Sequence, residues 1–342
     1  MKRKFTVMLL TMALIFPMIL NSSVLAAEMD EDKETLSADL TVEIQKDGSV
    51  APVENTSQLS EANLNLILER IGYPVDSIQN WDIARKRRLA SYGGVVVNGY
   101  ITDSKHDYVS SDGSSYEVTE YNENEIRNIQ IEDLRKAGVT QSQIDEYNLI
   151  EVDTAEESVE TRSVLGGHYT SFPGEYKDDK WSAQVSVARI GETSTQIKYV
   201  VTMDYFWEEA PTVHYGDVAG LTWASYGSPI ANTASSQHAI NLPVSNLWSV
   251  YNNTIDTSNN LGITADLYYS PAIQLNKEMG YLEEQIFVSK GLIGQQQAIS
   301  AAYGHPWFSN NWSLSIGVGG LSFSNSITNG DQWSWRYNFT VL

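Results

Sequence analysis

The sequence predicts an α+β protein, in which a small, helical and acidic N-terminal region precedes an all-β antiparallel sandwich or barrel domain. From Trp181 onward apolar residues alternate with polar ones, which is the period of half-buried strands. Helical spacing with glycine stops is confined to residues before 150. Eight of the nine tryptophans follow residue 164. At 342 residues and 42% hydrophobic, the chain is long enough for a sizeable core.

Residues 1–26 have the composition of a signal peptide. Three basic residues precede an apolar run that ends near Leu20, and small residues lead to a cleavage position at Ala26. Because the run is shorter than the ~20 residues that cross a bilayer, we expect cleavage, export and no transmembrane segment in the mature chain. Residues 27–58 are acidic and poor in large apolar side chains, which predicts a disordered segment.

Residues 59–150 are predicted to form a small helical domain with two helix-turn-helix units. The first unit begins at the Ser60 cap, its first helix ends at Gly72, and a second short helix covers 81–90. The same pattern returns 66 residues later in a helix that ends at Gly138. The small apolar faces of the two units are expected to pack on each other or on a partner. A strand is expected between the units, at 95–101.

Residues 151–164 are acidic and almost free of large apolar side chains, which predicts a linker between the two regions. Arg162 is the only basic residue in this stretch. It is either a protease cut point that would release an acidic pro-region or an ordinary exposed arginine.

Residues 165–342 are predicted to form the antiparallel β domain. All odd positions of 197–207 are apolar or aromatic, and a hairpin turn at 191–195 precedes them. The even positions are mixed, as expected for a half-buried strand. Further strands are expected at 221–226, 263–269 and 285–288.

The end of the chain predicts two more strands joined by a hairpin. Apolar residues alternate with serine and glycine from 312 to 324, and Gly319–Gly320 shifts the alternation by one residue, as a β-bulge would. Asn329–Gly330 is typical of a hairpin turn, and a clean aromatic alternation follows over 333–341. Trp333 and Trp335 lie on its apolar face, so we expect both in the core.

The sequence lacks the residues that most catalytic sites need. Without cysteine there are no disulfides, thiolate metal sites or cysteine nucleophiles. The short motifs of nucleotide enzymes and of common hydrolases are absent. Residues 256–260 resemble a polar loop more than a calcium loop. We therefore predict no cofactor and no bound metal, and we expect every histidine on the surface or in a turn: His106, His168, His214, His238 and His305.

A carboxylate-based hydrolase remains an alternative. Such an enzyme needs two carboxyl groups that converge across a sugar. Asp204, Glu208 or Glu209 with Asp266 is one such combination, which the spacing in the sequence does not support.

The charge of the chain excludes one class of partner. It carries 43 acidic and 22 basic residues, a formal net charge of −21, which would repel nucleic acid. The one dense basic run is Arg85 to Arg88. We expect it to pair with neighbouring carboxylates on a solvated helix, with contact to anionic lipid or wall polymer as the alternative.

The aromatic residues give the best indication of function, because exposed rings stack on sugars and bury in interfaces. Three tryptophans are candidate ligand-binding residues: Trp307, in a turn-like segment, Trp248 and Trp223. We therefore expect a secreted, non-enzymatic binding or interaction protein whose partner is a carbohydrate or a cell-surface polymer. A second alternative is a membrane-inserting protein with a releasable N-terminal pro-region, because the alternation at 312–324 would suit a strand with one face in lipid.

Overall fold

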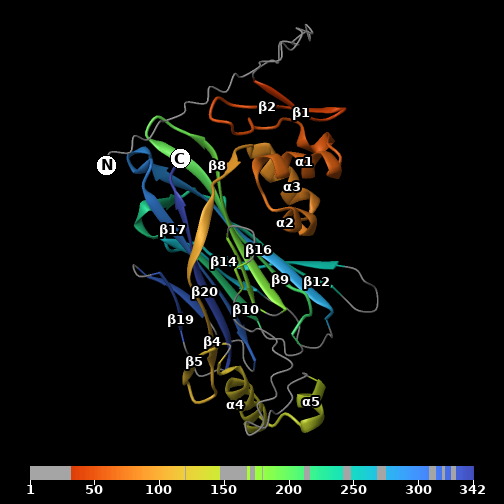
Figure 1. Ribbon diagram of the computed structural model, residues 1–342, viewed down its shortest axis with the longest axis vertical. Coiled ribbons are helices and arrows are strands. Elements are labelled where there is room, and N and C mark those ends of the chain that lie inside the picture. The colour runs from red at the N-terminus through yellow and green to blue at the C-terminus, as the bar shows by residue number, and fades with distance from the viewer. Residues whose placement is uncertain are drawn as a thin grey trace, which may run out of the picture.

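Two antiparallel sheets stacked face to face form the body of the molecule in this computed structural model (Figure 1). The described residues are 32–119, 121–146, 168–169, 174–178, 180–211, 216–241, 248–267, 275–307, 313–317, 320–324 and 329–342. Aromatic and branched side chains from both sheets fill the space between them. Of the two predicted forms of the β domain, the structure has the sandwich.

The larger sheet has nine strands and carries the groove described below. Its order is β13 (Trp248–Asn252), β12 (Ser235–Asn241), β16 (Lys277–Ser289), β9 (Gln196–Trp207), β8 (Trp181–Glu192), β7 (Glu175–Asp178) and β6 (His168–Tyr169), with β11 (Gly227–Pro229) paired to β16 and β3 (Val95–Val96) paired to β8. The long central strands pair in continuous antiparallel register, apart from one bulge in β8.

The smaller sheet has seven strands. Its order is β14 (Thr254–Asp256), β15 (Gly262–Leu267), β10 (Asp217–Thr222), β17 (Gln296–Pro306), β20 (Gly330–Thr340), β4 (Gly99–Val109) and β5 (Ser115–Glu117). Three short 3-10 turns complete the chain trace: η1 (Thr56–Gln58), η2 (Ala224–Tyr226) and η3 (Lys290–Leu292). Trp333 and Trp335 of β20 are buried in the core, as predicted.

Strand β9 follows the predicted alternation, and its two faces meet different surroundings. The odd positions from Ile197 to Trp207 are all buried in the core between the sheets. On the other face Val200 is buried beneath helices, whereas Asp204 borders the groove. The mixed even positions therefore reflect a sheet face that helices cover in one part only.

Three helices cover that part of the nine-stranded sheet: α1 (Glu61–Ile71), α2 (Val75–Asn80) and α3 (Ile83–Tyr92). Their apolar faces form a second core with Ala188 and Val200 of the sheet. A hairpin of β1 (Lys33–Ser37) and β2 (Leu40–Glu43) joins this core. The prediction of a disordered segment over 27–58 is therefore wrong from residue 32 onward, because its few apolar residues are spaced to bury on the helices.

Helices α4 (Glu123–Lys136) and α5 (Gln141–Glu146) lie at the opposite end of the sandwich (Figure 1). Both predicted helix-glycine-helix patterns thus exist, with Gly72 and Gly138 in the left-handed region. The expectation that the two units pack on each other is wrong. The buried carboxylate of Asp133 ties α4 to the sheet by accepting hydrogen bonds from Tyr108 Oη at 3.0 Å and Ser110 Oγ at 2.7 Å.

The predicted boundary near residue 150 does not separate helices from strands. Strands β3, β4 and β5 come from within 59–150 and pair with the sheets of the β domain. The signal peptide 1–26, the linker 151–164, Ala26 and Arg162 lie outside the described residues. Among the described residues, no helix is long and apolar enough to cross a membrane.

The segment predicted as one bulged strand forms a tight hairpin instead. Strand β18 (Ser313–Gly317) pairs with β19 (Gly320–Ser324), and Gly317 faces Gly320 across the turn. Gly320 has a φ of 121°, which suits the turn that two adjacent glycines make possible. The hairpin expected at Asn329–Gly330 is also wrong, because β20 pairs with β17 and β4 rather than with β19.

Candidate functional site

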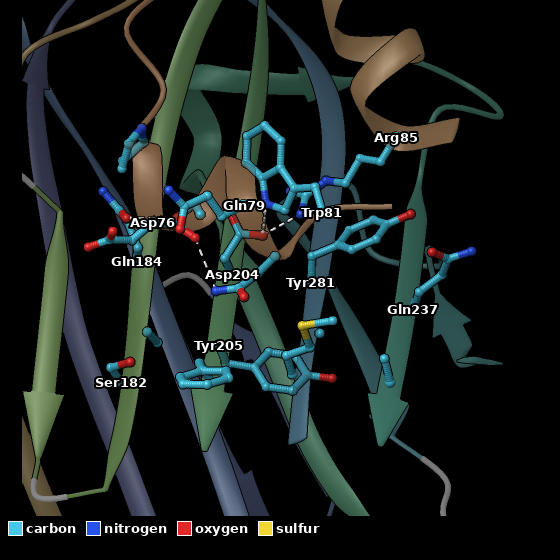
Figure 2. A pocket seen from close by; sticks show the side chains of 18 of the residues that line it. Asp76, Gln79, Trp81, Arg85, Ser182, Gln184, Asp204, Tyr205, Gln237 and Tyr281 are labelled. Carbon is cyan, nitrogen blue, oxygen red and sulfur yellow. Dashed lines mark hydrogen bonds and ion pairs between the residues drawn. The ribbon is translucent and has the colours of Figure 1, made fainter. Parts of the chain in front are cut away.

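A groove of about 400 Å³ crosses the outer face of the nine-stranded sheet beside α2 (Figure 2). Strands β8, β9, β12 and β16 form its floor, and the chain from Pro74 to Arg85 forms one wall. Its lining combines amides, hydroxyls and carboxylates with apolar side chains: Asp76, Ser77, Gln79, Trp81, Arg85, Ser182, Gln184, Asp204, Phe206, Gln237, Ala239, Val250, Met279 and Tyr281. This is the size and mixture typical of ligand sites.

Local capping fixes the wall of the groove. Pro74 begins α2, and Asp82 begins α3 by accepting hydrogen bonds from the backbone amides of Ala84 and Arg85 at 2.7 and 3.0 Å. Trp81 lies between the two helices, at the C-terminal end of α2. A hydrogen bond from Ser77 Oγ to Gln184 Oε1, at 3.0 Å, connects α2 to β8.

A buried ion pair between helix and sheet lies at the base of the groove. The Arg85 side chain is 1% exposed and pairs with Asp204 and, at 3.4 Å, with Glu283. Its guanidinium lies over the rings of Trp81 and Tyr281, at 4.3 and 3.8 Å from their centroids. Burial alone would lower the pKa of Arg85, but the charges of Asp204 and Glu283 raise it above its usual value. The guanidinium therefore stays charged.

The prediction for the basic run from Arg85 to Arg88 is confirmed in one part and wrong in another. Pairing with carboxylates is confirmed for Arg85, for Lys86 with Glu61, and for Arg88 with Glu283. The expected solvated helix face is wrong, because Arg85 and Lys86 are buried. The carboxylates that pair with Arg85 and Arg88 lie on strands far along the chain. The local sequence pattern does not show them, so it predicted that this helix face is exposed to solvent.

Two polar atoms at the base of the groove have no hydrogen-bond partner within the described part of the chain. They are Nη2 of Arg85 and Oδ2 of Asp204, one a donor and the other an acceptor. The other oxygen of Asp204 does have partners, since Oδ1 pairs with Arg85 and also accepts a hydrogen bond from Trp81 Nε1 at 2.8 Å. Buried polar atoms without partners cost free energy. A water or a ligand hydroxyl at the base of the groove would relieve this cost.

The groove is acidic. Its lining holds five carboxylates, from Asp76, Asp82, Glu175, Asp204 and Glu208, and two basic groups, Arg85 and Lys177. Lys177 is committed to Glu208 at 2.8 Å and Arg85 to the sheet. An anionic ligand would therefore meet repulsion here.

A glycine in strand β16 affects the packing beneath the groove. At Gly280 an added Cβ would lie 2.1 Å from Tyr205 Oη and 2.5 Å from the backbone oxygen of Gln237. The missing side chain leaves room for the Tyr205 hydroxyl, which lies 3.0 Å from Nδ1 of buried His238. Glycine at this position thus makes room for the Tyr205 side chain in the core beneath the groove.

None of the tryptophans proposed from the sequence lines the groove. Trp223 is 0% exposed and its Nε1 donates to the backbone oxygen of Asn260 at 3.0 Å, so an exposed ring is wrong there. Trp307 is half-buried against Tyr108 and its Nε1 donates to Asp331 at 2.8 Å. Trp248 is 39% exposed on the edge strand β13.

The groove instead uses Trp81, Phe206 and Tyr281, which sequence reasoning missed. Trp81 offered one signal, because it is the single tryptophan of the acidic N-terminal half and stands directly before the helix cap Asp82. Phe206 occupies an even position of β9, where an exposed polar residue is the ordinary choice. Tyr281 gave no signal, because its strand has no regular alternation.

The histidine prediction is wrong for three of the five. His106, His238 and His305 are buried or nearly so, each beside a carboxylate. The side chains of His168 and His214 are outside the described residues. In the described part of the chain no group of three or more histidines and carboxylates could hold a metal ion.

The proposed carboxylate combination does not converge. Asp266 belongs to β15 in the seven-stranded sheet, whereas Asp204 faces outward from the nine-stranded sheet. Glu208 and Glu209 pair with Lys177 and Lys180. A hydrolase built on these groups is therefore not supported by their positions.

Comparison with known proteins gives no family. No protein-family model matches the chain. No curated protein matches its sequence.

Solved structures similar to this chain include three from bacterial surfaces. The collagen binding subdomain of the Enterococcus faecalis surface protein ACE is 8% identical over 48% of this chain and 98% of that one, with a TM-score of 0.26. The RrgB pilus protein from Streptococcus pneumoniae is 6% identical over 44% and 32%, with a TM-score of 0.26. The collagen binding domain of the Erysipelothrix rhusiopathiae surface protein RspB is 10% identical over 50% and 62%, with a TM-score of 0.23. Scores this low carry no argument about ligand or activity.

Proposed function

We propose that this protein is an exported, non-enzymatic binding protein that holds a neutral or amino-sugar polysaccharide in the groove beside α2. The observation that carries the proposal is the groove itself, with its volume of about 400 Å³ and its lining of polar, acidic and apolar groups. Export rests on the signal-peptide composition of residues 1–26.

The polar lining suits sugar hydroxyls. Gln79 and Gln237 each present an amide that donates and accepts, Ser182 presents a hydroxyl, and Asp76 presents a carboxylate. A sugar ring offers donors and acceptors from neighbouring carbons, so planar amide and carboxylate groups can bridge two hydroxyls.

The apolar lining suits the carbon face of a sugar. Phe206, Ala239, Val250 and Met279 form an apolar strip on the strands of the floor. Carbon-bound hydrogens of a pyranose pack on such surfaces while its hydroxyls reach the polar wall. The open groove accepts a chain of rings rather than a single enclosed one.

Charge narrows the class of polysaccharide. With five carboxylates against two committed basic groups in the groove, and a net charge of −21 for the chain, polyanions are disfavoured. Neutral glucans and protonated glucosamine polymers avoid this repulsion. Binding rather than hydrolysis is favoured because Asp204 and Glu208 are engaged by Arg85 and Lys177, and glycosidases need two carboxylates that face each other across the bond.

The test uses one variant that fills the groove and one that removes a polar group from it. In Ser182→Trp an indole replaces a small side chain on the floor, and Gln237→Ala removes one amide. Each variant should bind a neutral glucan or a glucosamine oligosaccharide at least about tenfold more weakly, or ~1.4 kcal/mol. Gln295→Ala, an exposed amide beyond the groove lining, is the matched control and should bind like the parent.

Affinity electrophoresis and calorimetry with the two polymers, and with hyaluronan as the anionic comparison, give the measurement. Retention of hyaluronan alone would overturn the charge argument. A parent that retains no polymer, or a Ser182→Trp variant that binds as well as the parent, would remove the groove as the binding site.

A further inference from the structure

The β18–β19 hairpin is attached to the sandwich without belonging to either main sheet. Among the described strands its two strands pair only with each other. It packs on the outer face of the seven-stranded sheet, on the other side of the sandwich from the groove. In Figure 1 strand β19 lies at the margin of the molecule, away from the helices.

The hairpin has two chemically distinct faces. Leu314 faces Phe323 and Ile316 faces Leu321 across the strands, which puts these four apolar residues on one face. The other face consists of serine and glycine only, from the pairs Ser313 with Ser324, Ser315 with Ser322, and Gly317 with Gly320.

The apolar face is incompletely buried where it docks. Leu314 is buried, and Ile316, Leu321 and Phe323 are partly buried. Their partners on the sheet are the small residues Val109, Val218 and Ala302. Gly220 makes room for them, since a Cβ there would lie 2.8 Å from Leu321 Cδ2.

A side chain from outside the hairpin also holds it, because the backbone oxygen of Ile316 accepts a hydrogen bond from Asn259 Nδ2 at 2.9 Å. The docking cluster is far smaller than the core between the sheets. Local opening of such an element needs much less free energy than global unfolding.

The surrounding sequence is free of charge. Residues 307–330, which span 24 positions, contain no Asp, Glu, Lys, Arg or His, in a chain of which 19% is charged. Charged groups strongly oppose transfer to lipid. Their absence here contrasts with the acidic composition of the chain as a whole.

We propose that the β18–β19 hairpin leaves the seven-stranded sheet at a zwitterionic lipid surface and lies in the membrane interface. Leu314, Ile316, Leu321 and Phe323 enter the acyl boundary, and the serine face stays in water. Each strand of five residues extends about 17 Å at ~3.4 Å per residue. A crossing strand needs about 9–11 residues, so the hairpin lies on the bilayer and does not cross it.

The lipid class follows from charge. The chain carries a net charge of −21, so anionic headgroups repel it, and the uncharged hairpin offers no lysine or arginine to offset this. Phosphatidylcholine vesicles should bind the protein, and vesicles with added phosphatidylserine should bind it less. The membrane contact proposed here is independent of the groove and of the polysaccharide.

The first test exploits the absence of cysteine from the chain. An environment-sensitive nitrobenzoxadiazole label is attached to Leu321→Cys or Leu314→Cys on the apolar face, and to Ser322→Cys or Ser315→Cys on the polar face. With phosphatidylcholine vesicles, the apolar-face labels should shift to the blue with a several-fold rise in emission, and the polar-face labels should not.

Each other result contradicts the proposal. If no label responds, the hairpin stays on the sheet. If all four respond equally, the hairpin does not lie at the interface as a two-faced strand pair. Release of a trapped dye from the vesicles would show spanning insertion instead of an interfacial location.

The second test asks whether undocking is required. In Gly220→Cys with Leu321→Cys, the two side chains face each other, and a disulfide between them would tether the hairpin to β10. The oxidised double variant should lose flotation with vesicles, and reduction should restore it. The single variant Gly220→Cys, oxidised in the same way, is the control. Equal flotation of oxidised and reduced double variants would overturn the undocking step.

Discussion

His106 is held between two aspartates near the end of the sandwich that carries α4 and α5. Its Nδ1 lies 2.8 Å from Asp178 Oδ2 and its Nε2 2.9 Å from Asp331 Oδ1. The same carboxylates accept from Trp333 Nε1 at 2.6 Å and from Trp307 Nε1 at 2.8 Å. Burial alone would lower the pKa of His106, but hydrogen bonds and charges from the two aspartates raise it to about 9.

This raised pKa predicts an alkaline loss of stability. The charged imidazolium contributes fully below pH ~6.5, the unfolded value, and its contribution disappears as pH rises through about 9. A shift of this size corresponds to about 3 kcal/mol. His106→Gln should therefore lower the free energy of unfolding by about that amount at pH 6, and by much less at pH 10. Urea unfolding at both pH values measures it. A cost that is the same at pH 6 and pH 10 would show that the charge of His106 does not stabilise the fold.

Single residues were the least predictable part of the site. The alternation of β20 placed Trp333 and Trp335 in the core, because period-two burial is a local property. The fate of Trp223 and Trp307 depends on contacts with Asn260 and Asp331. Such long-range partners leave no trace in the local pattern, so a tryptophan in a turn-like segment could not be told from a ligand-binding one.

At the scale of elements, α3 is held on the sheet by its buried arginine. Arg85 neutralises Asp204 and the 1% exposed Glu283, and its removal would leave a buried carboxylate with less compensation. Arg85→Met should lower the free energy of unfolding by about 3–5 kcal/mol. Arg87→Met in the same helix should cost less than about 1 kcal/mol, because Arg87 forms no ion pair with the residues that the structure describes. Equal costs in urea unfolding would mean that helix propensity, not the ion pair, anchors α3.

Helices and strands were predictable where the residues of one segment determine its structure by themselves. Ser60 caps α1 and Gly72 ends it in the left-handed region, as the local pattern indicated. Strand partners were not predictable in this way. The glycines at 319 and 320 suit a bulge or a hairpin equally, and only the pairing of Leu314 with Phe323 distinguishes them. Residues 32–58 were misjudged because their apolar residues are few and bury on α1, which lies later in the chain.

The whole molecule combines a strongly acidic chain with a fold that holds paired buried charges. The sequence predicted a sandwich or barrel because clean alternation over many strands leaves few other packings, and the structure decided between the two. The boundary predicted near residue 150 does not separate two structures, since β3 pairs with β8 and β4 pairs with β20, both of which lie far later in the chain. Helices and strands are thus joined into one cooperative structure, and charge acts on all of it.

A net charge of −21 predicts that salt stabilises this protein. Like charges repel more in the compact state than in the unfolded chain, and raising NaCl from about 20 to 200 mM shortens the Debye length from about 20 Å to below 10 Å. The exposed pairs Lys177–Glu208 and Lys180–Glu209 weaken in the same range, but exposed pairs contribute little. We expect the relief of repulsion to exceed the weakening of these ion pairs by about 1 kcal/mol, which raises Tm by about 2–4 °C. Calorimetry in NaCl, with sucrose of equal osmolality as the control for excluded-solute effects, measures this rise. A fall in Tm with salt would mean that the ion pairs, and not the net charge, dominate the surface electrostatics.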